Sequence, residues 1–421
     1  MDNFRSAGNN NSGGRCFCSG ADFYAACQVP PQVRWRRPDA PLIRDRAGNL
    51  YGTTAFGGTS DNGTIFKIDH GSGKITVLHR FISVDGVSPH AGLIRDSEGN
   101  SYGTTDHGGD TNCNPPNGCG TVFKLNRTGK LIVLHTFTGP DGDSPGHATL
   151  LRDSSGALYG TAVGGGPGGG GGVVFKLDPD GAETVLHTFS ERADGNGPSA
   201  GLVRDVDGNL YGTTVNGGIF NDTTCQVVGC GVVFELSPTS SGWKETVLYR
   251  FTGGSDGGYP QSALVLDQHG NLYGTTTVGG NFAGQNCTGA GCGTIFKLQL
   301  SSGGWTETVL YAFSDGLDGQ FPWAGLVRDA AGNLFGSAVF GGDLNCNSPQ
   351  GCGAIFNLDT SRKLTVLHTF TGTDGELPVA DLLFDRSAHL LYGTASYGGD
   401  LHCKGLFGPG CGSVFKLALR K

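Results

Sequence analysis

The chain has 421 residues, including 76 glycines and 24 phenylalanines, and a net charge of −8. Hydrophobic residues make up 37% of it, enough to supply one large core, and the glycines follow no collagen-like period. The negative charge argues against nucleic acid as the partner, and no apolar run is long enough for a membrane helix.

Residues 1–28 form an atypical, polar segment that we expect to be disordered, followed by a single domain over residues 29–421. The segment has no apolar core of the kind a secretory signal needs. Its cysteines, Cys16, Cys18 and Cys27, cannot be paired from the sequence. Residues 32–35 are the only strand-like run before the first repeat.

From residue 42 onward one motif recurs seven times, starting near residues 42, 93, 150, 202, 264, 326 and 382. Its fullest form is A-G-L-V-R-D-x-x-G-N-L-Y-G-T-T, a glycine-rich loop, G-C-G-T-V-F-K-L, E-T-V-L-H-T-F and a D-G-x-x-P turn. Each copy holds four strand candidates, and its D-x-x-G-N segment predicts a tight hairpin closed by the aspartate and a positive-φ glycine. Helix signals are absent. The sequence therefore predicts an all-β, seven-bladed β-propeller of four-stranded antiparallel blades.

The two ends of the repeat array predict how the ring closes. The first repeat begins with its first strand at Leu42, and the seventh stops after its third strand, near Leu417. An N-terminal strand would complete the last blade and remove an exposed edge, and residues 32–35 are the candidate. An open solenoid is the alternative.

Ten cysteines fall in pairs within one loop of the repeat: Cys113/Cys119, Cys225/Cys230, Cys287/Cys292, Cys346/Cys352 and Cys403/Cys411. A repeat carries both members or neither, which predicts disulfides. Zinc is the rival interpretation, but two thiolates supply half a tetrahedral site, so no metal is expected. Disulfides indicate an oxidising compartment and hence an extracellular or cell-surface location.

Two positions differ from repeat to repeat where most others recur. A seven-fold scaffold that binds one asymmetric ligand must break its own symmetry, so variable loop positions are the better site candidates. The first position, three residues before the first-strand leucine, is expected at the mouth of the central channel: Asp39, His90, His147, Ser199, Gln261, Trp323 and Val379. Phe321 lies beside Trp323. The second, before a Gly-Gly pair, adds His107, Phe340 and Tyr397. Drift at tolerant positions is the alternative.

Recurring polar positions are expected to be structural. One equivalent position of the repeat is occupied by His79, His135, His187 and His368, and by Tyr249 and Tyr311 in two other repeats. Because both residue types have a ring with a polar tip, we expect this side chain to pack and to make one hydrogen bond. The recurring first-strand arginines, such as Arg44 and Arg95, either pair with a neighbouring aspartate or face an anionic ligand.

The recurring G-N-L-Y-G-T-T…G-C-G-T-V-F-K-L pattern over residues 42–417 resembles the Gloeobacter–Verrucomicrobia (GloVer) type of bacterial tandem repeat. That resemblance implies a propeller-like fold and a surface location, and it brings no catalytic residues. The D-x-x-G-N-L-Y hairpin is more weakly similar to NHL-type propellers.

No G-x-S-x-G, H-E-x-x-H or phosphate-loop motif is present. The sequence favours a secreted or cell-surface binding module, monomeric and without a cofactor, that holds a glycan or a protein on its disulfide-clamped loop face. One alternative is a carbohydrate-active lyase or hydrolase with a site at the channel mouth. Another is a structural repeat protein of the cell envelope.

Overall fold

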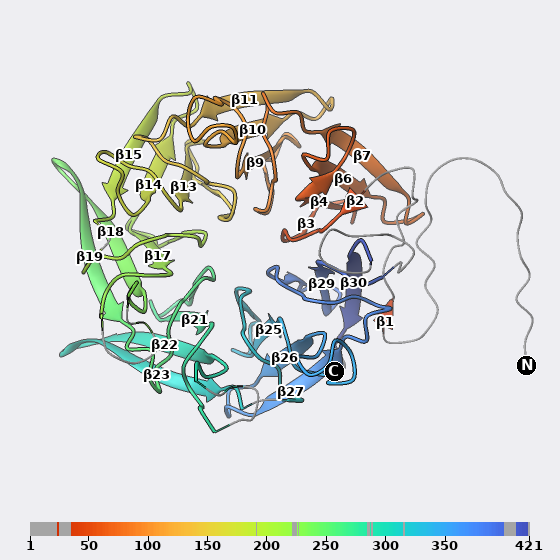
Figure 1. The fold of residues 1–421 in the computed structure, drawn as a ribbon, viewed down its shortest axis with the longest axis vertical. Helices are drawn as coiled ribbons and strands as arrows, with labels where there is room; N and C mark the ends of the chain where they lie inside the picture. The colour runs from red at the N-terminus through yellow and green to blue at the C-terminus, as the bar shows by residue number, and fades with distance from the viewer. Residues whose placement is uncertain are drawn as a thin grey trace, which may run out of the picture.

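A computed structural model shows the chain closed into a ring of seven four-stranded antiparallel sheets (Figure 1). The structure describes residues 23–24, 35–190, 192–220, 225, 227–283, 287, 289–314, 316–399 and 410–419. Within these residues all helix-or-strand structure is β-strand. The predicted all-β, seven-bladed propeller is confirmed.

Each blade begins with a very short strand at the centre of the ring, and in blades 1–6 it ends with a longer strand at the rim. The innermost strands are β3 (Ile43–Arg44), β8 (Ile94–Arg95), β12 (Leu151–Arg152), β16 (Val203–Arg204), β20 (Val265–Leu266), β24 (Val327–Arg328) and β28 (Leu383–Asp385). The second strands are β4 (Leu50–Thr54), β9 (Ser101–Thr105), β13 (Leu158–Ala162), β17 (Leu210–Thr214), β21 (Leu272–Thr276), β25 (Leu334–Ala338) and β29 (Leu390–Ala395).

The third and outermost strands follow in the same order. The third strands are β6 (Thr64–Ile68), β10 (Thr121–Leu125), β14 (Val173–Leu177), β18 (Val232–Thr239), β22 (Thr294–Ser301), β26 (Ala354–Leu358) and β30 (Ser413–Ala418). The outermost strands are β7 (Ile75–Arg80), β11 (Leu131–Thr136), β15 (Glu183–Thr188), β19 (Gly242–Arg250), β23 (Gly304–Ala312), β27 (Leu364–Thr369) and, for the last blade, β1 (Phe23–Tyr24).

Phenylalanines hold neighbouring blades together. Phe66 on the third strand of blade 1 is fully buried, and Phe81, which follows the outermost strand, is buried as well. Phe81 packs edge-on against Phe123 of the next blade, with ring centroids 5.2 Å apart, and the same contact recurs between successive blades as far as Phe370 and Phe415. Burying one such ring stabilises the fold by roughly 2–3 kcal/mol, so the blade interfaces form the core of the molecule.

The D-x-x-G-N hairpin has the predicted geometry. The Asp45 carboxylate accepts hydrogen bonds from the amides of Ala47 and Asn49 and from the Tyr51 hydroxyl, 2.9–3.0 Å away. Gly48 has a φ of 90°, in the region that favours glycine. The carboxylate thereby satisfies the backbone amides of the turn that joins the two inner strands.

An N-terminal strand closes the ring, as predicted, but residues 32–35 do not supply it. Strand β1 pairs with β30, with Phe23 opposite Leu417, and comes from the stretch 1–28 that the sequence sets apart. The predicted run is described only at Trp35, where β2 (Trp35–Arg36) pairs with β5 (Phe56–Gly57).

The physical reason for this difference is that residues 35–41 are an inter-blade turn. Val87 pairs with His107 before blade 2, and Arg36 pairs with Phe56 in the same way before blade 1. R-R-P-D-A-P-L therefore corresponds to V-S-P-H-A-G-L of the next repeat, and the outermost strand has to lie earlier in the chain.

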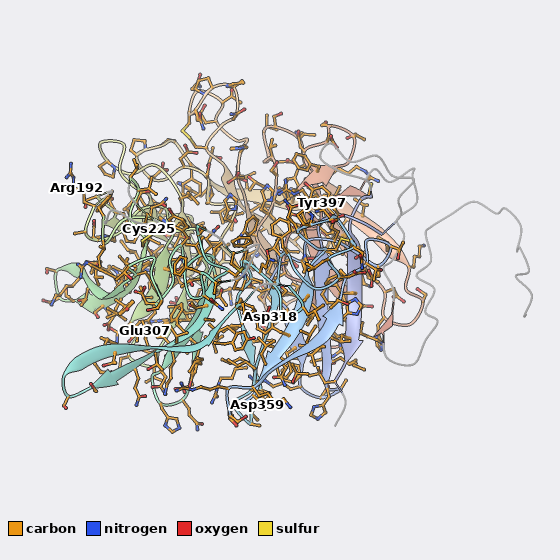
Figure 2. The ribbon with its side chains drawn as sticks, turned by 60° about the horizontal axis from the view of Figure 1, so that its bottom comes forward. Arg192, Cys225, Glu307, Asp318, Asp359 and Tyr397 are labelled. Carbon is orange, nitrogen blue, oxygen red and sulfur yellow. A yellow bond between two sulfur atoms is a disulfide. The ribbon has the colours of Figure 1, made fainter. Side chains whose placement is uncertain are left out.

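The two faces of the ring differ. Links from second to third strand, and from each blade to the next, lie on one face, where Figure 2 labels Cys225 and Tyr397; Asp359, between β26 and β27, lies on the opposite face. Four predicted disulfides clamp the first face: Cys113–Cys119, Cys225–Cys230, Cys287–Cys292 and Cys346–Cys352. Cys403, the predicted partner of Cys411, lies outside the described residues, as do Cys16, Cys18 and Cys27.

Candidate functional site

The seven residues of the first variable position meet in one cavity of about 250 Å³ at the looped end of the central channel. Each residue follows an inter-blade turn and precedes an innermost strand, which brings it to the channel mouth. These residues are Asp39, His90, His147, Ser199, Gln261, Trp323 and Val379. The convergence of these side chains that the repeat pattern predicts is therefore present, while ligand binding by them stays a prediction.

The disulfide loops hold the turns that place these side chains. The amide of Phe321 donates to the carbonyl of Cys292, and the amide of Ser144 donates to that of Cys119, at 3.0 and 3.1 Å. Phe321 has a φ of 53°, an uncommon conformation for a bulky residue that its surroundings have to maintain. The clamped loop of one blade thus fixes the turn that leads to Trp323 in the next blade.

Blades 1 and 2 contribute an Asp–His pair to the cavity. The Nδ1 atom of His90 lies 3.1 Å from Oδ2 of Asp39, and Nε of Arg37 lies 2.8 Å from the same oxygen. Asp39 is buried, whereas the Arg37 side chain is 33% exposed. The aspartate is therefore neutralised by an arginine and orients the imidazole of His90.

Blades 2 and 3 contribute a second Asp–His pair. Nε2 of His147 lies 3.6 Å from Oδ1 of Asp106, and Nε2 of His107 lies 3.5 Å from its Oδ2. Blade 3 has one extra turn residue, Gly146, where a Cβ atom would stand 2.4 Å from the Asp106 amide nitrogen. Only glycine permits this approach, which brings His147 beside Asp106.

The two pairs stack on one another. The rings of His90 and His147 are parallel within 5°, with centroids 5.4 Å apart. Burial in the cavity lowers the pKa of His147, although the Asp106 carboxylate acts in the opposite direction. The His147 imidazole is therefore mainly neutral near pH 7, and 48% of its side chain is exposed.

Trp323, on blade 6, lies across the seven-membered ring from blades 2 and 3, and it is 40% exposed. Beside it the Gln261 amide donates to Thr277 Oγ1 at 3.1 Å. Asp381 of blade 7 also lines the cavity; its Oδ1 accepts the Gly325 amide, and burial raises the pKa of its carboxyl group. An aromatic wall with a carboxyl group thus faces the histidine wall.

Sequence reasoning missed Asp381 and Asp106. Asp381 occupies the position two residues after the first variable one, where the other repeats have only small or uncharged residues, and the same symmetry argument would have found it. Asp106 immediately precedes His107 in the sequence. Its contact with His147 depends on the close approach of the turn at Gly146, which only the structure reveals.

Four predicted site residues lie behind the cavity lining rather than in it. Phe321 packs edge-on against Phe340 at 6.0 Å, and Tyr397 lies 5.8 Å from the Arg37 guanidinium. His107 contacts Asp106. These residues support the lining, and a direct role for them in ligand binding stays a prediction.

The hydrogen bond predicted for the recurring rim histidines is present at His79, His135 and His368. His135 Nε2 lies 2.9 Å from Asp141 Oδ2, and Tyr249 makes the equivalent bond to Asp256 at 3.1 Å. With Glu183, His135 and Asp141 form the one group among the described residues whose side chains could hold a metal ion, with ligand atoms within 4.8 Å of one another. This group lies at the rim, away from the cavity.

The first-strand arginines contact the preceding blade. Arg44 pairs with Asp385 at 2.8 Å, and the Arg95 guanidinium lies 4.4 Å from the centre of the Tyr51 ring. Pairing with an aspartate, one of the two predicted roles, is thus present at Arg44, whereas Arg95 stacks on a tyrosine ring.

In the described part of the chain no helix is long and apolar enough to cross a membrane.

The fold and the cavity define a disulfide-clamped β-propeller with a cavity of about 250 Å³ at one end of its channel. The chain belongs to the Gloeobacter/Verrucomicrobia repeat family, whose pattern matches residues 5–115, 33–226 and 225–407. This confirms the resemblance drawn from the repeat. No curated protein matches the sequence.

Solved structures with similar folds are distant in sequence. The extracellular domain of a proposed hybrid two-component system from B. thetaiotaomicron has 13% identity and a TM-score of 0.56; the match covers 95% of this chain and 40% of that one. An oligogalacturonate lyase from Vibrio parahaemolyticus has 11% identity and a TM-score of 0.53, with 92% and 91% covered. These likenesses show the fold alone.

Proposed function

We propose that this protein is a secreted or cell-surface binding module that holds a sugar unit of a glycan in the channel-mouth cavity. The observation that carries the proposal is the convergence of all seven residues of the first variable position on one cavity. Because these residues differ from blade to blade, the cavity presents an asymmetric surface to a ligand.

The lining has the chemistry that sugars require. Trp323 offers an exposed aromatic face for stacking, and Gln261, Ser199 and the two histidines offer hydrogen-bond donors and acceptors. A cavity of about 250 Å³ is slightly smaller than typical sites for drug-sized ligands, which suits one sugar ring with its chain leading out of the mouth. A folded protein partner would contact mainly the surrounding loops.

The disulfides support an extracellular location. Four pairs clamp loops on the cavity face, and such bonds persist in oxidising compartments. Ligands available in such compartments include the glycans of cell walls and extracellular matrices.

A glycan array probed with the full chain tests the proposal, followed by calorimetry on the best ligand. Trp323→Ala is expected to weaken binding by roughly 1–3 kcal/mol, as for a lost aromatic anchor. Phe282→Ala is the matched control, because Phe282 is also 40% exposed but lies on a blade 5 loop and does not line the cavity. An equal loss in both variants would move the site to the loops, and no binding to any glycan by the parent protein would refute the proposal.

A further inference from the structure

We propose, building on the sugar-binding function above, that the two stacked Asp–His pairs make the channel mouth a catalytic site that cleaves uronate-containing glycans by β-elimination. One imidazole removes a proton from the sugar ring, and the other returns a proton to the oxygen that leaves. The residues that carry this activity are His147 with Asp106 and His90 with Asp39.

The pairing of His90 leaves one nitrogen for the substrate. Nδ1 faces Oδ2 of Asp39 at 3.1 Å, and Arg37 holds that oxygen from the other side at 2.8 Å. An aspartate that accepts from Nδ1 orients the imidazole ring, as in other Asp–His pairs. Nε2 of His90 is then the atom that can hold a proton for delivery.

His147 has the properties of the proton acceptor. Its side chain is the more exposed of the two, at 48% against 17% for His90. Because burial lowers its pKa, it is available as a neutral base at neutral pH. Its 3.6 Å approach to Asp106 provides the charge that stabilises the imidazolium once the proton has moved.

Arg37 indicates the class of substrate. An imidazole is a weak base for a C–H bond unless that bond is next to a carboxylate whose charge is neutralised. Arg37 is the arginine of the cavity lining, and its guanidinium keeps N–H groups beyond the Nε that faces Asp39. A uronate carboxylate that binds these N–H groups would share the guanidinium charge with Asp39, and its adjacent ring proton would become more acidic.

The step balances without any further reactant. His147 takes the proton from the carbon next to the carboxylate, the C–H electron pair forms a C=C bond, and the C–O bond to the next sugar breaks. His90 protonates the leaving oxygen. Both rings stand on the same wall, 5.4 Å apart, so removal and donation occur on one face of the sugar.

Hydrolysis by a pair of carboxyl groups is less compatible with the same cavity. Asp39 is held by Arg37 and His90, and Asp381 accepts the Gly325 amide. Both carboxyl groups already have partners on one oxygen, and the product of the assay below distinguishes hydrolysis from elimination.

The full chain should be assayed on a glucuronate polymer and on mannuronate-rich alginate, in which the C5 proton and the C4 oxygen lie on one face of the ring. Polygalacturonate, in which they lie on opposite faces, and a neutral glucan are the negative controls. The expected result is a new ultraviolet absorbance from the unsaturated uronate, formed in equal amount with new reducing ends. His147→Gln and His90→Gln should each lower kcat by about 10²-fold or more with a small change in ligand affinity. His135→Tyr at the rim should keep the parent rate, since Tyr249 and Asp256 already form that pair in another blade.

The outcomes separate this activity from simple binding. Uronate binding that depends on Trp323 but gives no cleavage product overturns the catalytic proposal and leaves the binding function standing. Reducing ends without absorbance overturn elimination in favour of hydrolysis. If no acidic or neutral glycan binds or reacts, the binding function and the activity both fail.

Discussion

The rim and the mouth of this propeller contain the same chemical pair, an imidazole beside an aspartate, in two settings. At the rim His135 and Asp141 repeat a contact that recurs around the ring, and tyrosine replaces the histidine in two blades. At the mouth Asp39–His90 and Asp106–His147 occur once each. In a repeat protein, therefore, the pair that recurs supports the scaffold, and the pair that occurs once is the candidate for function.

Access to the pair differs in the same direction. The His135 side chain is 17% exposed and packs edge-on against Phe137, whereas His147 is 48% exposed and faces the cavity. The rim histidine is covered by residues of its own blade. The mouth histidine has exposed ring atoms that a ligand can contact.

The largest effect should come from opening the rim. Deleting residues 1–28 removes β1, leaves the edge of β30 unpaired and should cause aggregation or lower Tm by about 10 °C or more. Deleting residues 1–20 keeps β1 and serves as the control. Equal melting curves for both truncations and the full chain, measured by calorimetry, would show that β1 contributes little to closure.

Removing one aspartate from each setting should separate stability from function. Asp141 accepts bonds from His135, the Thr138 amide and the Thr138 hydroxyl at 2.8–2.9 Å, so Asp141→Ala should cost about 2–4 kcal/mol in urea unfolding. Asp106 contacts its histidines only at 3.5–3.6 Å, so Asp106→Ala should cost less than about 1 kcal/mol but impair the cavity. Equal losses of stability would remove the distinction between rim and mouth.

The smallest effect concerns pH and two rim carboxyl groups. Burial and then the Asp194 carboxylate raise the pKa of Glu245 to about 7, and burial and Asp256 do the same for Glu307. Because the folded pKa exceeds the unfolded value of 4.5, these groups stabilise the fold below pH 4.5, and that contribution is lost as pH rises to about 7.

Replacing both glutamates by glutamine should flatten the fall in stability over this range. The difference should be about 1 kcal/mol per site, since both groups are partly exposed. Unfolding free energies at pH 4.5, 6 and 7.5 would measure it, and parallel curves for parent and variant would contradict the raised pKa values. In blade 2 Leu131 stands at the corresponding place, so the scaffold does not need the carboxyl group there.

The repeat made most of the fold predictable. Period, hairpin aspartates and paired cysteines are local patterns written several times, so each copy supports the others. The closing strand was misplaced because β1 has only two paired residues and no alternation to detect. The alignment of R-R-P-D-A-P-L with V-S-P-H-A-G-L of the next repeat would have shown that residues 36–42 are a turn and that the closing strand lies earlier in the chain.

The site was predictable as a ring of positions but not as a chemical arrangement. Variation at Asp39, His90, His147 and Trp323 located the cavity. The partners of these side chains depend on contacts between blades, such as the approach of Asp106 to His147 past Gly146, which no local pattern records.

The turn that leads to each cavity residue has a consequence for how such proteins can diversify. Every blade delivers one side chain to the mouth from a turn that is hydrogen-bonded to the loop of the preceding blade, and Asp39 and His90 are 51 residues apart in the chain although they touch. A single substitution therefore changes one sector of the cavity wall and leaves the frame intact. Seven such sectors can vary independently, so one architecture can present a large repertoire of cavities.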